Sequence, residues 1–550
     1  MPDSYEMPTW GWGDSAHSRD LSDAVRARLQ TQLGVGKEVE LVAREEADFN
    51  VQDSLLDERL LQGLSELVGE ENIRSDKMFR VLRSAGKSYP DMISLRGGEP
   101  GDVPDAVVQP ADQASLREVL SYCSEHAIAV TPFGGGTSVV GGLATVREGF
   151  SGAISVDLTN LSGLTSLDAE SGLATFAGGT RGPAAEQLLS DHQLTIGHFP
   201  QSFEYGTVGG FVATRSAGQS STGYGRIDKN VIGLTAATPT GPVRFAPMPG
   251  TAAGPDLRQL LTGSEGSMGI IDTVTLQVKK TPDVLLDRAW MAPDFATGRA
   301  ALRELEKAGC APDVARLSDE SETEVSLLLA GDSTPVKALR GYLGLRGRNS
   351  GCMMITCFEG SRLDSSQRHR ESSDILRRHG VIALGGAPAQ GWRKGRFAGP
   401  YMRDALMDAG LFVETLETAA PWSQLESVYS AVGDALRDAL GSLGGEPLVM
   451  CHVSHLYQTG ASLYFTFIGR QPGASVAEKI QVWHGVKSAA CDAIIQSGGT
   501  ISHHHAVGRD HAPWLESEIG EAGIRLLRAA KAELDPGGIM NPGRLVLTGS

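Results

Sequence analysis

Clustered glycines constrain this chain more than any other feature of its sequence. The 550 residues include 68 glycines, and many of them gather in a few short segments. Glycine carries no Cβ atom, so the backbone can turn sharply or approach another group closely. The first cluster, VTPFGGGTSVVGGL at residues 130–143, follows an apolar stretch. Its glycine N–H groups, with the hydroxyls of Thr137 and Ser138, would form a cradle for a pyrophosphate.

The spacing in this cluster matches neither the dinucleotide fingerprint of a Rossmann unit nor a P-loop. Taken alone, the cluster is equally consistent with a glycine-rich hairpin. Three further segments of small residues follow it, at 178–179, 197–234 and 262–268. Four such segments within one region of mixed helices and strands predict a long ligand that lies across that region.

Composition narrows the class of protein. The formal net charge of −17 argues against nucleic acid as a partner, because a phosphate backbone requires clustered Lys and Arg. The six cysteines are scattered without a CxxC pair, which is typical of free thiols in a reducing compartment. The chain has no apolar run of the ~20 residues that cross a bilayer and begins without a signal peptide. We therefore expect a cytoplasmic protein.

A chain of 550 residues is too long for one hydrophobic core, so we expect several domains. Residues 1–90 contain two amphipathic stretches, each opened by Ser or Asp and closed by Gly, and are expected to be a helical segment. Residues 91–280 alternate short strands, helices and glycine loops. Residues 281–495 mix longer helices and strands in an α+β substrate domain. Residues 496–550 form a C-terminal segment that contains a histidine run.

Four motifs give the chain a family resemblance: PFGGGTS, EYGTVGG with ATRSAG, TGSEGSMG, and LDPGGIMNPGRL. Together they resemble the flavoproteins of the vanillyl-alcohol oxidase and p-cresol methylhydroxylase (PCMH) type. The resemblance implies an α+β fold, with a two-subdomain PCMH-type FAD-binding domain, an α+β cap domain and helical terminal segments. Some members of the family bind flavin covalently through a histidine in the first loop. Here Thr137 and Ser138 stand there and no histidine does, so we expect non-covalent FAD.

In the family, the PFGGGTS-like loop binds the FAD pyrophosphate. The segments that match residues 201–207 and 213–216 lie along the isoalloxazine and ribityl chain, and the segment that matches residues 263–266 contacts the adenine side. The residues that the resemblance assigns to FAD binding are Pro132, Phe133, Gly134, Gly135, Gly136, Thr137, Ser138, Gln201, Ser202, Phe203, Glu204, Tyr205, Gly206, Thr207, Ala213, Thr214, Arg215, Ser216, Thr262, Gly263, Ser264, Glu265, Gly266, Ser267 and Met268.

The run His503, His504 and His505 permits three interpretations: a metal site, a packed loop or a catalytic cluster. Adjacent residues of an extended loop point in alternate directions, so three in a row rarely bind one ion. No HExxH motif accompanies the run, and we expect no metal. Histidine has an ordinary pKa of about 6.5, which suits proton transfer near neutral pH.

Four stretches of the second half, YMRD, ETLETAAPW, TGASLYFTF and SHHHAVGRDH, resemble the alkyldihydroxyacetonephosphate synthase branch of the family. The resemblance implies exchange of the acyl chain of acyl-dihydroxyacetone phosphate for a fatty alcohol through an adduct at flavin N5, a step of ether lipid synthesis. It assigns catalysis to Tyr464 and the three histidines and substrate binding to Arg403, with Arg509 as a second cation for the phosphate. The sequence leaves open which histidine is the base.

Two departures from the sequence of this branch mean that the resemblance supports the architecture of the site more strongly than it supports the ether-lipid substrate. Ala506 and Arg509 stand where the synthases have Gly and Lys. The main alternative is an FAD-dependent dehydrogenase or oxidase for a D-2-hydroxy acid such as lactate or glycolate. A flavoprotein-derived binding module without activity is a third. A long acyl chain would require an apolar tunnel, and residues 326–331 and 411–416 are candidates to line it. The resemblance also implies a homodimer, and leaves a peripheral membrane contact open.

Overall fold

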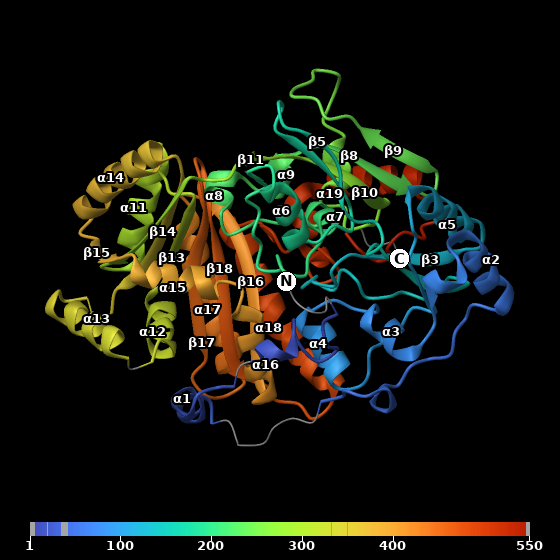
Figure 1. Ribbon diagram of the computed structural model, residues 1–550. Helices are drawn as coiled ribbons and strands as arrows, with labels where there is room; N and C mark the ends of the chain where they lie inside the picture. Colours follow the sequence, from blue (N-terminus) through green and yellow to red (C-terminus); the bar gives the residue numbers. More distant parts are fainter. Residues whose placement is uncertain (1–5, 19, 35–41, 332, 349, 546–550) are drawn as a thin grey trace.

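Three larger β-sheets and a two-stranded ribbon organise the described part of the chain, and the helices pack against them (Figure 1). The computed structural model describes residues 6–18, 20–34, 42–331, 333–348 and 350–545. Two sheets belong to the predicted FAD-binding domain and the largest to the predicted substrate domain. The α+β fold class expected from the sequence is confirmed.

The first sheet positions the first glycine loop. Its strand order is β1 (Ile73–Arg74), β2 (Ala106–Val108), β4 (Gly152–Asp157) and β3 (Ile128–Phe133). β2, β4 and β3 run parallel to one another, and β4 is buried along its whole length, as expected for a parallel strand covered on both faces. β3 ends at Phe133 and delivers the chain directly into the glycine loop. The carboxyl end of a parallel sheet is a usual place for a ligand.

The second sheet is antiparallel, in the order β5 (Leu164–Asp168), β6 (Leu173–Ala177), β10 (Ile270–Gln277), β8 (Val231–Thr238) and β9 (Gly241–Phe245). A two-stranded ribbon, β7 (Leu194–Thr195) with β11 (Lys279–Lys280), lies beside it. The helices of the N-terminal and FAD-binding parts are α1 (Asp23–Leu33), α2 (Glu58–Val68), α3 (Lys77–Leu82), α4 (Tyr89–Arg96), α5 (Gln113–Glu125), α6 (Gly182–Ser190), α7 (Val208–Ala213), α8 (Ser221–Tyr224), α9 (Ile227–Asn230) and α10 (Arg258–Leu261).

The largest sheet has seven antiparallel strands in the order β15 (Ile382–Gly385), β12 (Val284–Ala292), β14 (Cys352–Gly360), β13 (Val314–Ser318), β17 (Leu448–Tyr457), β18 (Gly460–Arg470) and β16 (Leu411–Pro421). The helices of this half are α11 (Phe295–Lys307), α12 (Glu320–Leu329), α13 (Thr334–Leu345), α14 (Arg362–Arg378), α15 (Ala387–Gly395), α16 (Gly399–Asp408), α17 (Leu425–Gly441) and α18 (Val476–Ser497), whereas the last helix, α19 (Ala512–Leu534), packs against the second sheet. α17 and α18 supply Val428, Leu436 and Trp483 to the core that this sheet shares with them.

The pairing register of the large sheet sets up a row of functional side chains. Glu417 on β16 faces Tyr464 on β18, and Tyr464 in turn faces His452 on β17. Residues directly opposite each other on neighbouring strands share a face and lie close together. Three strands therefore place these side chains in one line, although they are far apart in the sequence.

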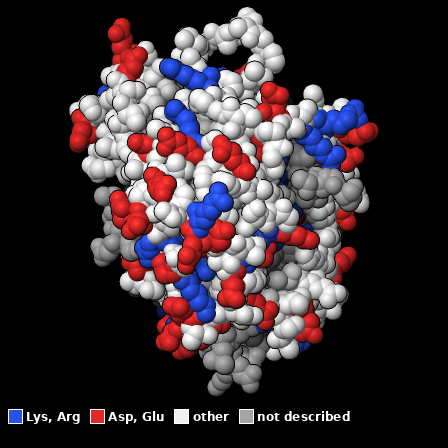
Figure 2. Space-filling model, turned by 90° about the vertical axis from the view of Figure 1, so that its right-hand side faces the viewer, with Lys and Arg blue, Asp and Glu red and all other residues white. Residues whose placement is uncertain are grey.

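The capping signals read from the N-terminal segment are confirmed. Ser22 caps α1 and Asp57 caps α2 through their side chains, and the helices end at Gly34 and Gly69. Ahead of α1, residues 6–14 contain no helix, and hydrogen bonds with Lys87, Arg96 and Asp404 hold this segment between the two halves of the molecule. No helix in the described part of the chain is both long and apolar enough to span a bilayer. Figure 2 shows the side that carries α2 and α5, where basic and acidic side chains are interspersed.

Candidate active site

A cavity of about 650 Å³ lies between the FAD-binding half and the large sheet. The first glycine loop and the 201–219 segment form one side of it, and β17, β18 and the histidine run form the other. Segments that are hundreds of residues apart thus meet around one space. The sequence-predicted FAD region and the sequence-predicted catalytic residues share this space.

The first glycine loop has the geometry of an anion cradle. Within the described residues, the backbone N–H groups of 134–138 donate to no protein acceptor. Gly136 has a left-handed φ of +68°. A Cβ atom on Gly135 would lie 2.0 Å from the carbonyl oxygen of Tyr205, so only glycine lets these two segments touch. A run of unoccupied N–H donors beside a cavity fits the pyrophosphate of FAD.

Most of the residues assigned to FAD do line the cavity. They are Pro132, Gly134, Gly135, Gly136, Thr137, Ser138, Gln201, Ser202, Gly206, Thr207, Ala213, Thr214, Ser216, Glu265 and Gly266. The assigned residues that lie outside its lining are Phe133, Phe203, Glu204, Tyr205, Arg215, Thr262, Gly263, Ser264, Ser267 and Met268. Several lining residues were not among those assigned to FAD: Gly142, Gly209, Gly210 and Gly269 of the glycine loops, Leu158 after β4, and Ile270 and Ile271 on β10. The glycines among them belong to the same small-residue segments, which was the available signal.

Glu265 connects the FAD-binding half to the histidine loop. Its carboxylate accepts hydrogen bonds from the N–H groups of Val507 (2.9 Å) and Gly508 (2.8 and 3.0 Å). Burial raises the pKa of Glu265 to about 7, and these N–H groups oppose the increase. The side chain therefore holds the end of the histidine loop against the cofactor region.

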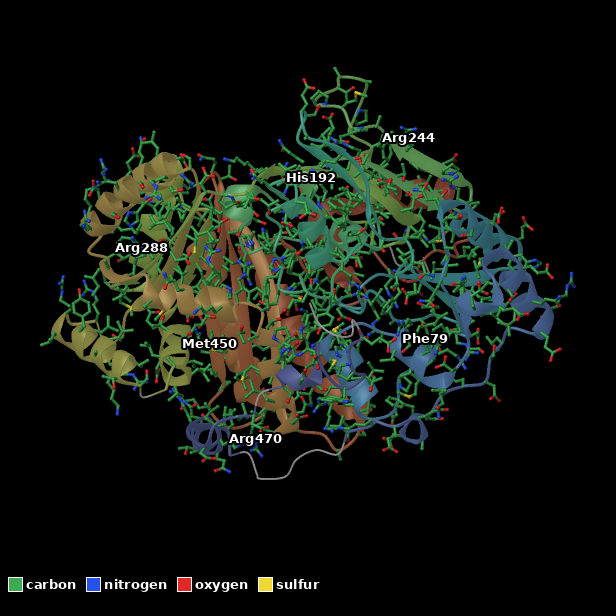
Figure 3. The ribbon with its side chains drawn as sticks, viewed as in Figure 1. Phe79, His192, Arg244, Arg288, Met450 and Arg470 are labelled. Carbon is green, nitrogen blue, oxygen red and sulfur yellow. The ribbon has the colours of Figure 1, made fainter. Side chains whose placement is uncertain are left out.

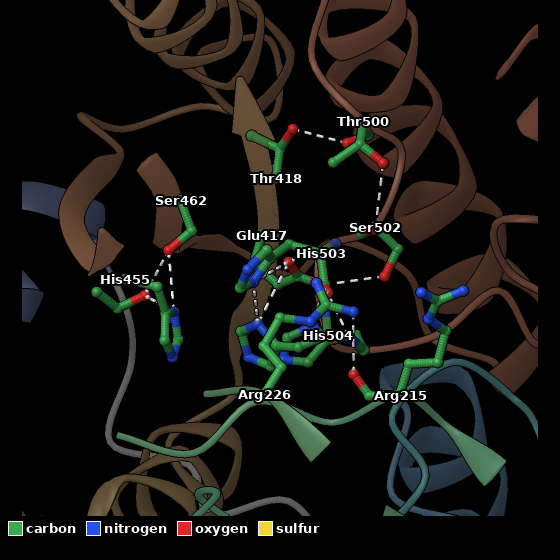
Figure 4. A network of polar contacts seen from close by, with 12 residues as sticks. Arg215, Arg226, Glu417, Thr418, His455, Ser462, Thr500, Ser502, His503 and His504 are labelled. Atoms are coloured by element: carbon green, nitrogen blue, oxygen red, sulfur yellow. Dashed lines mark hydrogen bonds and ion pairs between the residues drawn. The ribbon is translucent and has the colours of Figure 1, made fainter. Parts of the chain in front are cut away.

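Glu417 holds the beginning of the same loop (Figure 4). Its side chain is fully buried, and it accepts hydrogen bonds from the backbone N–H groups of His503 (2.7 Å), His504 (2.9 Å) and His505 (2.8 Å), and from the hydroxyl of Ser502 (2.9 Å). Burial alone would raise its pKa, but the three neighbouring histidines and the hydrogen bond with His504 hold the pKa well below its usual value. An ionised carboxylate thus fixes all three histidines, and sequence reasoning did not single it out.

The three histidines occupy different environments. His503 is buried at 4% exposure, lies outside the cavity lining and hydrogen-bonds to the hydroxyl of Tyr457, while Arg226 donates to its carbonyl oxygen (2.7 Å). His504 and His505 line the cavity. The Nδ1 atom of His504 lies 3.0 Å from Nδ1 of His503 and 3.4 Å from Glu417. Its Nε2 atom has no hydrogen-bond partner among the side chains and backbone that the structure describes.

Protonation is disfavoured at the neighbours of His504. Burial lowers the pKa of His505 to about 3 and that of His503 well below its usual value. His455, on β17, is locked as a neutral ring, because its Nε2 donates to the carbonyl oxygen of Gly218 (2.9 Å) and its Nδ1 accepts from the hydroxyl of Ser462 (3.0 Å). Burial lowers its pKa to about 3. One ring nitrogen from each of His455, His503 and His504 lies within 4.8 Å of the others.

Tyr464 lies between two imidazole rings. It stacks on His504 at 6.0 Å and 20° and on His452 at 4.9 Å and 21°, measured between ring centroids and planes. Burial raises the pKa of Tyr464 to about 12, so its phenol is neutral and can donate a proton or a hydrogen bond. On the far side, His452 is held by Arg316 (2.9 Å) and Glu322 (3.0 Å). The ring of Tyr464 is therefore fixed within the cavity wall.

The two predicted substrate-binding arginines are placed differently. Arg403, on α16, lines the cavity, and its Nη1 donates to the carbonyl oxygen of Lys87 (2.8 Å). Arg509 lies outside the cavity lining, where its half-exposed guanidinium is 3.7 Å from Asp91 and 3.6 Å from Asp510. Because these two carboxylates already attract it, the structure brings Arg403 to the site and leaves Arg509 outside it.

An apolar limb extends the cavity away from the flavin loops. Its walls come from α1, α12, α16 and the large sheet, and they consist of Val25, Leu29, Val325, Leu328, Leu329, Leu406, Val413, Leu448, Met450 and Ile468. Figure 3 labels Met450 on β17. Residues 326–331 and 411–416 each contribute lining side chains, as the sequence predicted. Since Leu329 is also 49% exposed, the limb reaches the surface beside α12.

Comparison with known proteins agrees with this geometry. Residues 104–246 match the family described as "FAD binding domain", and residues 289–545 match "FAD linked oxidases, C-terminal domain". The chain therefore contains an FAD binding domain and an FAD linked oxidase C-terminal domain, and its FAD-binding fold is of the PCMH type.

Among similar proteins, alkyldihydroxyacetonephosphate synthase of Trypanosoma brucei brucei is 28% identical, over 99% of this chain and 93% of its own length. A solved structure of an alkyldihydroxyacetonephosphate synthase superposes with a TM-score of 0.84 at 24% identity, covering 98% of this chain and all of that one. p-Cresol methylhydroxylase with bound substrate superposes with a TM-score of 0.65 at 14% identity, over 89% of this chain and 96% of its own. The predicted resemblance and FAD as cofactor are confirmed.

Proposed function

We propose that this protein is an FAD-dependent transferase of the alkyldihydroxyacetonephosphate synthase type. It would exchange the acyl chain of acyl-dihydroxyacetone phosphate for a fatty alcohol and release a fatty acid, with no net oxidation. The observation that carries the proposal is the shape of the cavity: one space joins the FAD loops, Arg403, Tyr464 and His504 to a long apolar limb. A small hydroxy acid would fill only the polar end, whereas a long chain uses the limb as well.

The residues present fit FAD, and bound FAD would supply the ring system that accepts and returns electron density during the exchange. The flavin-side wall comprises the free N–H groups of 134–138, the hydroxyl of Thr207 and the backbone of 269–271. We infer non-covalent binding, since Thr137 and Ser138 stand at the loop where a covalent histidine would be needed.

His504 is the best candidate for the base. It lines the cavity, its Nδ1 atom is engaged by His503 and Glu417, and its Nε2 atom is without a protein partner in the described chain. It would remove the proton alpha to the substrate ketone and return it once the alcohol has entered. His503, packed behind the loop, would instead position it, while His505 completes the wall.

Two further side chains suit the exchange. Tyr464, a neutral phenol, would donate to the departing carboxylate oxygen. Arg403 would neutralise the substrate phosphate, because its guanidinium presents several donors in one plane. The fatty acid that leaves and the alcohol that enters would both occupy the apolar limb.

The test uses purified FAD-bound protein, palmitoyl-dihydroxyacetone phosphate and labelled hexadecanol, with no electron acceptor. We expect label in the ether product and one fatty acid released per exchange. In parallel, D-lactate and glycolate are added anaerobically, and we expect no bleaching of the flavin absorbance. Reversible bleaching without exchange would instead establish the dehydrogenase.

His504→Ala should reduce exchange by about 10²–10⁴-fold, the usual contribution of a general acid–base group. FAD should remain bound, because His504 does not belong to the pyrophosphate loop. His192→Ala, at an exposed position, is the matched control and should leave exchange unchanged. Wild-type turnover in His504→Ala would show that the histidine run is structural.

We also propose that the open end of the limb touches a lipid surface. Leu329, at the opening, and Tyr342 and Leu345, on the following helix α13, are exposed at 49%, 38% and 89%, and basic residues accompany them: Lys337, Arg340, Arg346 and Arg348. No acidic residue occurs between 333 and 358, so the stretch that contains α13 suits anionic lipid. Sedimentation with phosphatidylglycerol vesicles should retain the wild type and lose Leu345→Glu. Equal sedimentation of both would exclude this surface. The homodimer implied by the resemblance remains a prediction, and light scattering would test it by measuring the molar mass in solution.

A further inference from the structure

The N-terminal segment of residues 7–14 runs along the polar end of the cavity. Buried charged side chains from both halves of the molecule hold its backbone. Lys87 donates to the carbonyl oxygen of Pro8 (2.7 Å), Arg96 donates to that of Trp10 (2.8 Å), and Asp404 accepts from the N–H of Trp12 (2.6 Å). Hydrogen bonds to buried charged groups are among the strong ones in proteins. This segment is therefore anchored at the site.

The turn that brings Trp12 to the cavity depends on the residue after it. Gly13 has a left-handed φ of +63°, and a Cβ atom there would lie 2.1 Å from the hydroxyl of Tyr401. The same hydroxyl accepts from the N–H of Asp14 (3.3 Å). Tyr401 lies on α16, the helix that also carries Arg403. The segment and α16 are thus fitted to each other.

Trp12 contributes a polar atom without a partner. Its side chain lines the cavity, is only 5% exposed and packs edge-on against Tyr205 at 5.8 Å. Its indole Nε1 is buried and has no hydrogen-bond acceptor in the described part of the chain. A buried donor without an acceptor costs free energy, so native proteins rarely keep one unless a ligand or water accepts from it.

Arg403, which lines the same cavity, also has buried hydrogen-bond donors without an acceptor. Its Nη1 is bonded to the backbone of Lys87, but its Nε and Nη2 are buried and have no hydrogen-bond acceptor among the described residues. Nη2 lies 3.7 Å from a carboxylate oxygen of Asp404, an ion pair longer than a hydrogen bond. Both side chains line the same cavity, and the N–H of Trp12 is bonded to Asp404, the neighbour of Arg403, so two distant segments bring unused donors to one site.

We propose that Trp12 and Arg403 together form a subsite for a phosphate monoester, with Trp12 as a positioning and specificity-determining residue. The identity of the molecule that carries the phosphate rests on the proposed function. A carboxylate has two oxygens, which the Nε and Nη2 of Arg403 would satisfy. A phosphate monoester has three terminal oxygens, and the third accepts from the indole N–H. The pair of donors thus favours phosphate over carboxylate.

The experiment titrates the FAD-bound protein with dihydroxyacetone phosphate and follows the flavin absorbance. Trp12→Phe keeps an aromatic ring and removes only the donor, and it should weaken binding by about 10- to 100-fold, the loss expected for one hydrogen bond to a charged group. Trp10→Phe is the matched control and should bind as the wild type does. The side chain of Trp10 lies outside the cavity lining, and its contact with Arg96 uses the backbone.

A double-mutant cycle separates a phosphate contact from a packing defect. Trp12→Phe and Arg403→Lys should show coupled, non-additive losses for dihydroxyacetone phosphate, because both residues would bind one group. Neither change should alter the binding of dihydroxyacetone, which has no phosphate. The flavin spectrum of each variant verifies that FAD is retained, and Arg403→Lys alone tests the subsite if Trp12→Phe does not fold.

The outcomes distinguish this proposal from the proposed function. Wild-type affinity in Trp12→Phe, additive losses in the cycle, or no binding of dihydroxyacetone phosphate to the wild type would overturn the subsite. Equal losses for D-lactate would also overturn it, since they would make the donors a carboxylate site. Coupled losses in a protein without exchange activity would leave the subsite standing and remove the synthase function.

Discussion

Glu417→Gln is the sharpest test of how the histidine loop is built. One carboxylate oxygen accepts from Ser502 and from the N–H groups of His504 and His505, and the other accepts from the N–H of His503. A glutamine has nearly the same shape but only one acceptor oxygen. Whichever way its amide turns, an NH₂ group meets at least one of these buried N–H donors.

The expected loss follows from those contacts. With the amide oxygen facing the three-donor side, the hydrogen bond to His503 is lost and the three others become neutral. A lost hydrogen bond to a charged group costs about 1.5–3 kcal/mol, and a neutral one contributes about 1 kcal/mol less than its charged counterpart. We therefore expect a loss of about 4.5–6 kcal/mol in the free energy of unfolding. A displacement of His504 by about 1 Å should also lower exchange about 100-fold.

Thermal or urea unfolding measures the first effect, and the labelled-alcohol exchange assay measures the second. Glu414→Gln is the control on the same strand, since Glu414 accepts from the indole of Trp483 and from the N–H of Thr415, and no hydrogen bond joins it to the loop among the described residues. It should lower stability modestly and leave exchange per folded molecule unchanged. Wild-type unfolding together with full exchange activity in Glu417→Gln would show that Glu417 does not hold the histidine loop in place.

Three further predictions follow from single positions. Gly135→Ala would place a Cβ 2.0 Å from a backbone oxygen and should release FAD, seen as loss of flavin absorbance after gel filtration, whereas Gly250→Ala has open space and should retain it. Ala506 has a φ of +75°, and Ala506→Gly should raise the free energy of unfolding by about 0.5 kcal/mol or more. Glycine removes the ~1–2 kcal/mol strain of a left-handed alanine, but it loses ~0.5–1 kcal/mol more backbone entropy on folding. Thermal unfolding measures the difference. His455 has a folded pKa of about 3, below its unfolded value of about 6.5, so the unfolded state binds more protons between these values and stability falls as pH decreases through that window. At pH 5 the loss from this one group is about 2 kcal/mol, and His455→Gln should show a correspondingly shallower dependence in melts between pH 7 and 5.

Local signals predicted the parts of this protein that local physics determines. Ser22 and Asp57 predicted where their helices begin, because a side-chain cap and a closing glycine act within a few residues of the helix end. The loop at residues 134–138 could be predicted from its glycines, because a close approach between two backbone segments requires glycine. Arg403 and Tyr464 came from motif resemblance, and both line the cavity.

The remaining features depend on distant contacts that no local pattern carries. Glu417 was visible only as part of a motif, since its role requires partners 86 to 88 positions away. His503 and His504 are neighbours of one type, yet Tyr457 packs one away from the cavity that the other lines. Trp12 lay in a segment expected to be helical, and its place beside Arg403 follows from tertiary hydrogen bonds alone.

The histidine loop is also the joint between the two halves of the molecule. Glu417, from the large sheet, fixes its first half, and Glu265, from the FAD-binding half, fixes its second. Ala506 lies between these anchors in a left-handed conformation, which the chain adopts although it is costly for alanine. Two carboxylates that bind opposite ends of one short loop can both be satisfied only when the halves are docked. Correct placement of His504 and closure of the wall beside the flavin loops are therefore the same structural event.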